Sequence, residues 1–345
     1  MSVFHELLDE KSCLLADGAT GTNYFNLGLE TGYPPELWNV EEPDHVLGLH
    51  RDFLAAGSDL ILTNSFGGTG YRLKLHQAED RVAELNTAAA RLARTAVDAH
   101  QQATGQRAVV AGSMGPSGEL FEPLGALTHA DAVAAFTAQA EALAEGGVDL
   151  LWIETISAFE EVDAAYEAAA STGLPVAATM TFDTAGKSMM GVDPAAYAGH
   201  VGGKGAVALG ANCGVGPSEL MHSMMAMRGQ TKAALVAKGN CGIPEYRDGK
   251  IHYHGSPELM ASYAVLARDA GVAIIGGCCG TTPDHIRAMR HALDTTPVTP
   301  IGDVAARMDQ IWQVLGQPWA HVPHVPDQPS PDDDASGGRR RRRRS

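Results

Sequence analysis

Cysteine is scarce in this chain, and the usual marks of secreted and membrane proteins are missing. Five cysteines occur in 345 residues, an odd number that argues against a disulfide framework and toward metal binding or catalysis. The N-terminus has no basic stretch followed by an apolar run, so no signal peptide is predicted. Nowhere do about eighteen uncharged apolar residues run together, so no membrane span is predicted. We therefore expect a cytoplasmic protein without membrane contact.

Positive charge is also in short supply. The formal net charge is -16, which argues against general affinity for nucleic acid. The C-terminal end departs from this balance, because an acidic run and a glycine spacer precede six arginines. We expect residues 326–345 to form a disordered, solvated tail, and contact with an anion or a nucleic acid is the alternative.

What the chain does contain is a repeated pattern of short apolar runs, polar turns and amphipathic helical stretches. Near-continuous apolar strands that alternate with helices indicate a parallel sheet covered on both faces. Eight such units over about 280 residues match a (β/α)8 barrel, the TIM barrel. The eight predicted strands lie within residues 13–20, 59–66, 108–115, 149–156, 175–182, 207–214, 234–242 and 273–280. The clearest helical stretches lie at 78–99, 129–145, 158–171, 256–270 and 283–293.

This pattern sets the predicted domains. We expect a barrel domain over residues 1–295, a C-terminal extension over 296–325, and then the tail. A hydrophobic content of 45% allows the barrel a large core. An open doubly wound sheet is the alternative, and the lack of a GxGxxG motif after the first strand argues against it.

Reactive and polar residues gather where the predicted strands end, which is where barrel enzymes carry their chemistry. If the barrel closes, the sixth and eighth strands lie two apart around the ring. The side chains of Cys213, Cys278 and Cys279 can then meet at one mouth of the barrel. The strand ends read DGATGT at 17–22, TNSF at 63–66, ET at 154–155, NCG at 212–214, NCG at 240–242 and CCG at 278–280.

Three converging thiolates would make a zinc (Zn²⁺) site, because soft sulfur ligands suit this ion. Three protein ligands leave a fourth position open, as in catalytic zinc sites. Neighbouring residues of a strand point to opposite faces, so Cys278 and Cys279 can share one ion only where the strand ends and the backbone turns. The flanking glycines permit such a turn. The alternatives are a vicinal disulfide and two inert buried thiols.

Taken together, these motifs resemble those of the homocysteine S-methyltransferases, and the resemblance covers about residues 10–293. It implies a (β/α)8 barrel in which zinc, held by three cysteines, binds the thiolate of homocysteine and activates it toward a methyl donor. It also implies the zinc-ligand role for Cys213, Cys278 and Cys279. The matching motifs are GGCCG at 276–280, NCG at 212–214, DGATGT at 17–22, TNSFGG at 63–68 and WIET at 152–155.

The chemistry agrees with that resemblance. A free thiol has a pKa near 8.5, so only a few per cent is thiolate at neutral pH. Coordination to zinc removes the proton outright, and no general base is then needed. Cys241 is left out of the ligand set, because the family pattern asks for three ligands and a fourth thiolate would close the position that homocysteine needs.

Two segments are candidates for binding the amino-acid end of homocysteine. Glu154 can accept hydrogen bonds from its ammonium, a role that the resemblance also implies, and capping of the helix at 158–171 is the alternative. Asp17 and the loop that begins at Gly18 resemble the family's homocysteine-binding segment, where backbone amides approach the amino acid. On spacing alone the loop could be a phosphate cradle, but it lacks the lysine of a P-loop.

The family uses three classes of methyl donor: glycine betaine and related onium compounds, S-methylmethionine, and methylcobalamin in multidomain methionine synthases. Nothing after residue 295 is large enough for a folate or cobalamin domain, so we expect a corrinoid route to need a separate partner protein. Betaine carries a quaternary ammonium, which favours aromatic faces and a pocket without a fixed cation near the nitrogen. Trp38 is the first candidate face. Other nearby aromatic candidates, each of which can equally be ordinary packing, are Tyr24, Tyr33, Phe66 and Tyr71.

The sequence departs from the animal betaine enzymes at two points. Those enzymes have an aromatic pair in the strand-two loop, whereas Gly67 and Gly68 follow Phe66 here, and Thr155 stands where they have an aromatic residue. The segment at 63–76 looks more like bacterial stand-alone members, which favours betaine as the donor.

We therefore predict zinc-dependent methyl transfer from betaine to homocysteine, giving dimethylglycine and methionine. S-methylmethionine or a methylated corrinoid partner is the alternative donor. A protein that binds zinc and homocysteine without turnover is a remote alternative. The sequence leaves assembly into a homo-oligomer open.

Overall fold

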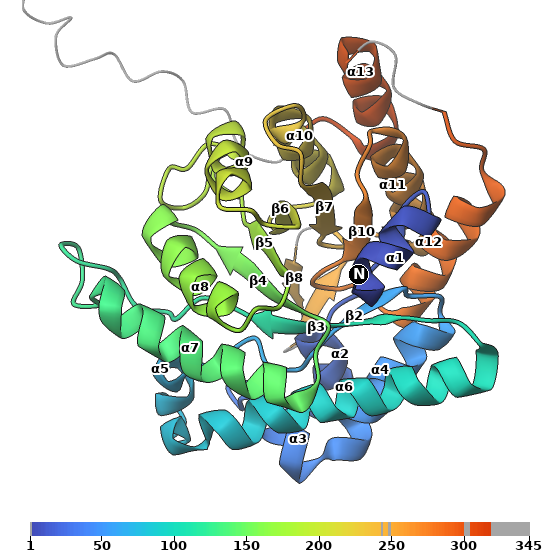
Figure 1. Ribbon diagram of the computed structural model, residues 1–345. Coiled ribbons are helices and arrows are strands. Elements are labelled where there is room, and N and C mark those ends of the chain that lie inside the picture. Colours follow the sequence, from blue (N-terminus) through green and yellow to red (C-terminus); the bar gives the residue numbers. More distant parts are fainter. Residues whose placement is uncertain (1, 243, 248–249, 300–303, 319–345) are drawn as a thin grey trace, which may run out of the picture.

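Eight parallel strands form a nearly closed barrel with helices around it, as Figure 1 shows. The computed structural model describes residues 2–242, 244–247, 250–299 and 304–318. The strands follow the order β1-β10-β7-β6-β5-β4-β3-β2 around the ring. Each lies inside a predicted run, so the (β/α)8 prediction is confirmed. The bounds are β1 Leu14–Leu15, β2 Leu60–Leu62, β3 Val109–Met114, β4 Leu150–Ile156, β5 Val176–Met180, β6 Ala208–Cys213, β7 Ala234–Gly239 and β10 Ile274–Gly277.

The ring closes at a short seam between β1 and β2. Ala16 and Leu60 form one parallel bridge, and the Asp17 N–H donates to the Leu60 carbonyl at 3.0 Å. The next donor along β2, the N–H of Leu62, has no backbone acceptor on β1 and donates instead to Asp17 Oδ2 at 2.8 Å. A side-chain carboxylate therefore continues the ladder where the backbone pairing stops.

The helices cover the outside of the barrel, and the five predicted ones are confirmed with small shifts at their ends. The largest shift is at α6, which starts after a short 3₁₀ turn and ends before Gly105, whose φ of 75° caps it. The barrel helices are α2 Gly21–Leu27, α3 Trp38–Glu41, α4 Pro43–Ala55, α5 Gly70–Lys74, α6 Val82–Thr104, α7 His129–Gly146, α8 Phe159–Ser171, α9 Pro194–Gly203, α10 Pro217–Met227, α11 Pro257–Asp269 and α12 Pro283–Thr295, with 3₁₀ turns η1 Pro35–Leu37 and η2 Glu79–Arg81.

Alternation along the strands separates two cores. Residues such as Leu62, Trp152 and Val236 point into the barrel, while their neighbours pack against the helices. The inner core also includes Phe4 and Leu7 of α1 (Val3–Glu10), which pack against one end of the barrel interior. That end is closed by α1, so the interior opens at the other end, where the strands finish.

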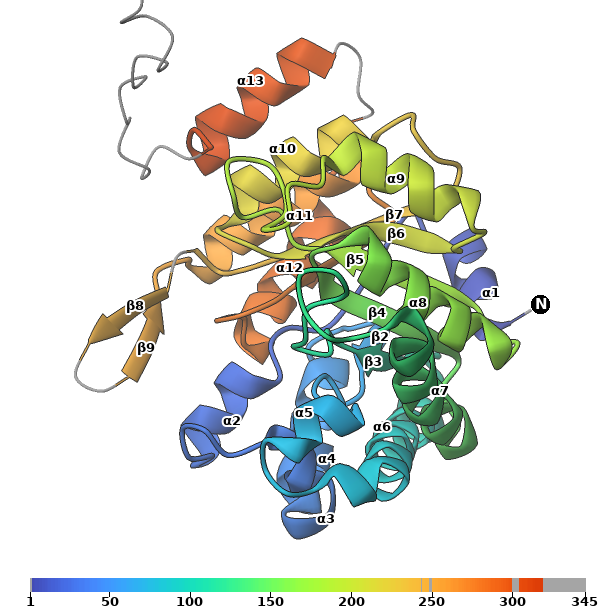
Figure 2. The same ribbon diagram turned by 90° about the vertical axis from the view of Figure 1, so that its left-hand side faces the viewer.

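Two elements lie outside the repeating pattern. The antiparallel hairpin of β8 (Pro244–Arg247) and β9 (Lys250–Tyr253) follows β7 and projects from the end opposite α1, as Figure 2 shows. Helix α13 (Val304–Leu315) lies in the predicted C-terminal extension and packs against the barrel helices. The domain boundaries themselves stay a prediction, and the tail at 326–345 lies outside the described residues. No helix in the described part is long and apolar enough to cross a bilayer.

Candidate metal and substrate site

Three thiols meet at the open end of the barrel. The Sγ atoms of Cys213, at the end of β6, and of Cys278 and Cys279, just after β10, all lie within 4.8 Å of one another. The Sγ atoms of Cys213 and Cys279 are 4.0 Å apart. Sulfur atoms about 2.3 Å from a tetrahedral zinc ion lie about 3.8 Å apart. The donor set and its spacing therefore fit a metal ion with three sulfur ligands.

The backbone turns sharply at both ligand-bearing strand ends. Cys213 has a φ of 61°, a left-handed conformation that non-glycine residues seldom adopt and that costs on the order of 1–3 kcal/mol. After β10, the Cys278 N–H still donates to the Gly239 carbonyl at 2.7 Å, and the chain then turns at Gly280, whose φ is 80°. A Cβ at Gly280 would lie 2.3 Å from the Tyr253 ring, so only glycine fits. This turn brings two adjacent cysteines to one side.

Two buried asparagines hold these loops in place. The Asn240 side chain, just beyond β7, accepts from the Cys279 N–H at 3.0 Å and donates to the Gly214 carbonyl at 2.5 Å. It therefore ties the Cys213 loop to the Cys278–Cys279 loop. Asn212 accepts from the Thr155 N–H at 2.9 Å and lies with its amide nitrogen 4.0 Å from the Cys278 Sγ.

The three thiols bind their protons tightly without a cation. Hydrogen bonding to Cys213 and burial raise the pKa of Cys278 well above its usual value. For Cys213, the hydrogen bond with Cys278 lowers the pKa, but contact with Cys279 and burial outweigh it and raise the pKa to about 12. A divalent metal bound here would supply the positive charge that makes three neighbouring thiolates tolerable.

Cys241 is buried close to this cluster but has other partners. Its thiol donates to the Gly255 carbonyl at 2.8 Å and lies 3.2 Å from His285 Nε2. Burial raises its pKa to about 11. The structure therefore places Cys241 beside the ligand loops and outside the group of three sulfurs.

Beneath the thiols lies a layer of buried charged groups. Glu154 of β4 is two residues beyond Trp152, so it also points into the barrel. Its Oε1 accepts from Ser113 Oγ at 2.5 Å, not from helix α8. Burial raises the pKa of Glu154, and the nearby Lys238 ammonium opposes that shift. Lys238 of β7 pairs with Asp17 at 2.5 Å.

The loop after β1, which begins at Asp17 and Gly18, faces the cavity with its backbone and not with the Asp17 carboxylate. Both oxygens of Asp17 are engaged within the protein, by the Leu62 N–H and by Lys238. In the described part of the chain, Lys238 lines the cavity and Asp17 does not. Gly18 does line it, and a Cβ at Gly18 would lie 2.7 Å from the Thr281 carbonyl. The loop thus packs directly against the loop that carries the paired cysteines.

One cavity of about 570 Å³ joins these groups, a size typical of small-molecule sites. Its wall includes the three cysteines, Glu154 and Lys238. On the side of α2 and α5 it also includes aromatic and charged side chains. These are Phe25, Tyr33, Phe66, Glu36, Arg72 and His76, and Tyr253 of the hairpin completes the wall.

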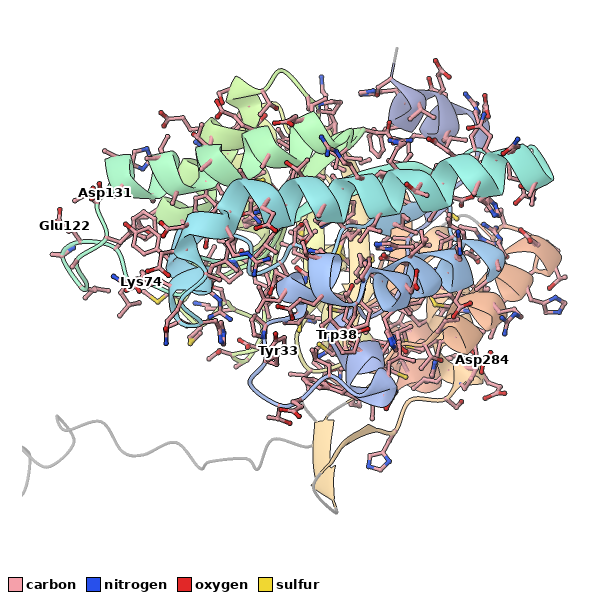
Figure 3. The ribbon with its side chains drawn as sticks, turned by 90° about the horizontal axis from the view of Figure 1, so that it is seen from below. Tyr33, Trp38, Lys74, Glu122, Asp131 and Asp284 are labelled. Carbon is pink, nitrogen blue, oxygen red and sulfur yellow. The ribbon has the colours of Figure 1, made fainter. Side chains whose placement is uncertain are left out.

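Trp38, the first candidate for a donor face, lies elsewhere. Its side chain is buried, with ring centroids 5.3 Å from Tyr24 and 5.0 Å from His45. Figure 3 shows that Tyr33 and Trp38 come from the same segment between α2 and α4. Within the described residues, only Tyr33 of this pair lines the cavity.

Several site residues were not assigned a role from the sequence, among them Glu36, Arg72, Lys238, Asn240 and Tyr253. For Lys238 a signal was present, because a lysine two residues after Val236 in an apolar strand has to face the barrel interior. Tyr253 gave none, because it ends a hairpin that lies outside the strand–helix pattern, and only its contact with Gly280 brings it to the cavity.

The chain is similar to known proteins over most of the barrel. The family model described as homocysteine S-methyltransferase matches residues 14–293. The chain is 29% identical over 295 residues to a methionine synthase of Mycobacterium leprae, and 30% identical over 265 residues to that of Mycobacterium tuberculosis. These matches cover 81% and 75% of this chain. The chain spans about a quarter of the length of those relatives, at 24% and 22%.

Among solved structures, the homocysteine methyltransferase MmuM of Escherichia coli is similar along nearly its whole length. Its metallated form superposes with a TM-score of 0.71 at 26% identity, covering 84% of this chain and 99% of that chain. Its oxidised form gives 0.72 at the same identity, covering 84% and 98%.

Proposed function

The chain belongs to the homocysteine S-methyltransferase family, and we propose that it methylates homocysteine to methionine at a zinc ion held by Cys213, Cys278 and Cys279. The observation that carries this proposal is the meeting of three sulfur atoms in the wall of a cavity that also contains Glu154. When bound, zinc would hold the homocysteine sulfur as a thiolate in the fourth position and so make it a nucleophile.

The protein's own residues orient the substrate. Glu154 is buried and has one oxygen bound to Ser113, so it can accept a charge-assisted hydrogen bond from the homocysteine ammonium. The Lys238 ammonium favours the ionised form of Glu154. The Gly18 loop lets backbone amides approach the amino-acid end. Asp17 supports this arrangement indirectly, because its ion pair fixes the position of Lys238.

We assign glycine betaine as the methyl donor and dimethylglycine as its product. The aromatic side chains that line the cavity, Tyr33, Phe66 and Tyr253, supply faces for a quaternary ammonium. Two cationic side chains, Lys238 and Arg72, also line the cavity. The charge of Lys238 is neutralised by its ion pair with Asp17. Tyr33 thus takes the part that the sequence suggested for Trp38. The cytoplasm is the compartment where we expect the reaction to occur.

A second candidate is transfer from a methylated corrinoid protein. It is favoured by the similarity to methionine synthases several times longer than this chain. S-methylmethionine is a further onium donor that the same aromatic wall would accept.

The test is turnover by the purified full-length protein loaded with zinc. Homocysteine is supplied with betaine, with S-methylmethionine, or with a methylated corrinoid protein, and methionine is measured. We expect methionine with betaine. Formation only with S-methylmethionine or only with the corrinoid protein would replace the donor assignment, and no methionine from any donor would overturn the proposed activity.

A further inference from the structure

Glu36 is a buried carboxylate in the cavity wall that the steps above do not use. It lies in η1, is 5% exposed, and its Oε1 accepts from the Gly67 N–H at 2.6 Å. A Cβ at Gly67 would lie 2.9 Å from that oxygen, so glycine permits the approach. Among the described residues, no side chain donates to Glu36 and no ion pair includes it. A buried carboxylate with so few donors is stabilised by a cation.

Arg72 of α5 lines the same cavity, and Arg72, followed by His76, acts on Glu36 through charge and not through a hydrogen bond. Its guanidinium packs beside Gly118, where a Cβ would lie 3.1 Å from Nη1. Within the described residues, Arg72 has no ion-pair partner. A guanidinium in this setting is suited to bind a carboxylate through two parallel hydrogen bonds.

We propose that Glu36 and Arg72 select the methyl donor as a zwitterion, with Glu36 facing the onium centre and Arg72 holding the carboxylate. This inference rests on the proposed function, because it requires an onium donor in the cavity. The two opposite charges and the aromatic faces of Tyr33 and Phe66 line the same cavity. Together they match a small molecule that carries a methylated cation and a carboxylate on one short chain.

The chemistry of transfer separates binding from catalysis at Glu36. A sulfur–carbon bond forms between the homocysteine thiolate and one donor methyl, and the nitrogen–carbon bond breaks. Its electron pair stays on nitrogen, which becomes a neutral amine. The positive charge that Glu36 faces therefore fades on the way to the transition state. Glu36 stabilises the bound donor more than the transition state, so its loss raises KM without lowering kcat.

The first experiment measures steady-state kinetics with betaine varied at saturating homocysteine. Glu36→Gln keeps the size of the side chain and the acceptor for Gly67, and removes only the charge. We expect its KM for betaine to rise about tenfold or more, with kcat equal or higher. Glu30→Gln is the matched control, since Glu30 is exposed in the neighbouring segment and does not line the cavity. An unchanged KM, or a lowered kcat at unchanged KM, would overturn the role of Glu36.

The second experiment separates the two charges. Tetramethylammonium is a donor probe without a carboxylate. The carbon isostere of betaine, 3,3-dimethylbutanoate, keeps the carboxylate and lacks the positive charge. Arg72→Gln is expected to raise KM for betaine about tenfold and to leave that for tetramethylammonium unchanged. Lys74→Gln, on the same helix but exposed and outside the wall (Figure 3), is the control. An equal effect of Arg72→Gln on both donors would overturn carboxylate recognition.

A measurement on the wild-type protein guards against variants that fail to fold. As an inhibitor competing with betaine at saturating homocysteine, 3,3-dimethylbutanoate should have an inhibition constant at least about tenfold above the KM for betaine. Equal values would overturn the inference whatever the variants do. If methionine forms only when a methylated corrinoid protein is the donor, the assignment of an onium donor is wrong. The inference about Glu36 and Arg72 then fails with the proposed function on which it rests. Turnover of betaine with unchanged Glu36→Gln kinetics would overturn only the inference.

Discussion

At the scale of single residues, each cysteine of the cluster should be required for the metal. Removing one sulfur leaves two protein ligands, too few for a tight zinc site. We expect about one zinc per wild-type chain, and loss of it in Cys213→Ala, Cys278→Ala and Cys279→Ala. Cys241→Ala should keep its zinc, because Cys241 bonds to Gly255 and lies outside the cluster. Metal analysis of the four variants decides this, and equal loss in Cys241→Ala would contradict the ligand set.

Glu154 should matter for the amino acid and not for the metal. Glu154→Ala is expected to keep zinc and fold while losing about 1.5–3 kcal/mol of homocysteine affinity, the value of a charge-assisted hydrogen bond. Calorimetric titration with homocysteine measures this.

The pH dependence of that affinity follows from burial, which raises the pKa of Glu154. Homocysteine binding should weaken as the pH falls through this raised pKa, because the protonated carboxyl carries no charge. Unchanged homocysteine affinity in Glu154→Ala would contradict a role in substrate binding and leave Glu154 only its structural hydrogen bond with Ser113.

Some residues of the site could be predicted from the sequence, and others could not. The cysteines and Glu154 follow from one rule, that polar residues at strand ends face the mouth of a barrel. Trp38 shows the limit of that rule, because its neighbour Tyr33 reaches the cavity while the Trp38 ring packs against Tyr24. Which face of a short irregular segment turns inward depends on tertiary packing, and no period in the sequence records it.

At the scale of elements, β7 acts as a brace between the two ligand loops through Asn240. Asn240→Ala should keep all three sulfurs but weaken zinc binding about 10–100-fold, as loss of supporting hydrogen bonds does in other zinc sites. Competition with a chelator measures this affinity. Asn26→Ala, at an exposed position on α2, is the control. Wild-type affinity in Asn240→Ala would show that the ligand loops hold their geometry unaided.

The elements themselves were predictable where their pattern is regular. All eight barrel strands lie within the predicted runs, because buried parallel strands are short and apolar. The hairpin of β8 and β9 was not predicted. Its residues carry no apolar run, and the position of Tyr253 at its base depends on a tertiary contact with Gly280.

At the scale of the whole molecule, the ion pair between Lys238 and Asp17 belongs both to the seam that closes the barrel and to the candidate site. Lys238→Met leaves Asp17 as a buried charge without its partner, which typically costs about 3–5 kcal/mol of unfolding free energy. The double variant Lys238→Met with Asp17→Asn should recover part of that loss, since Asn can still accept from Leu62. Urea unfolding of the wild type and the variants gives the comparison, and a neutral Lys238→Met would show that the seam does not depend on the pair.

The helix α1 seals one end of the barrel, and this imposes an order on events at the other. Glu154 is 8% exposed, whereas Tyr33 and Phe66 are 38% and 36% exposed, so the amino-acid pocket lies below the donor wall. Substrates and products enter and leave through one opening. A methyl donor already bound there would block homocysteine from reaching the three cysteines. Homocysteine should therefore enter first and methionine leave last. Product inhibition would reveal this sequence, with methionine competing against homocysteine, whereas a random order would let either substrate bind to the empty protein.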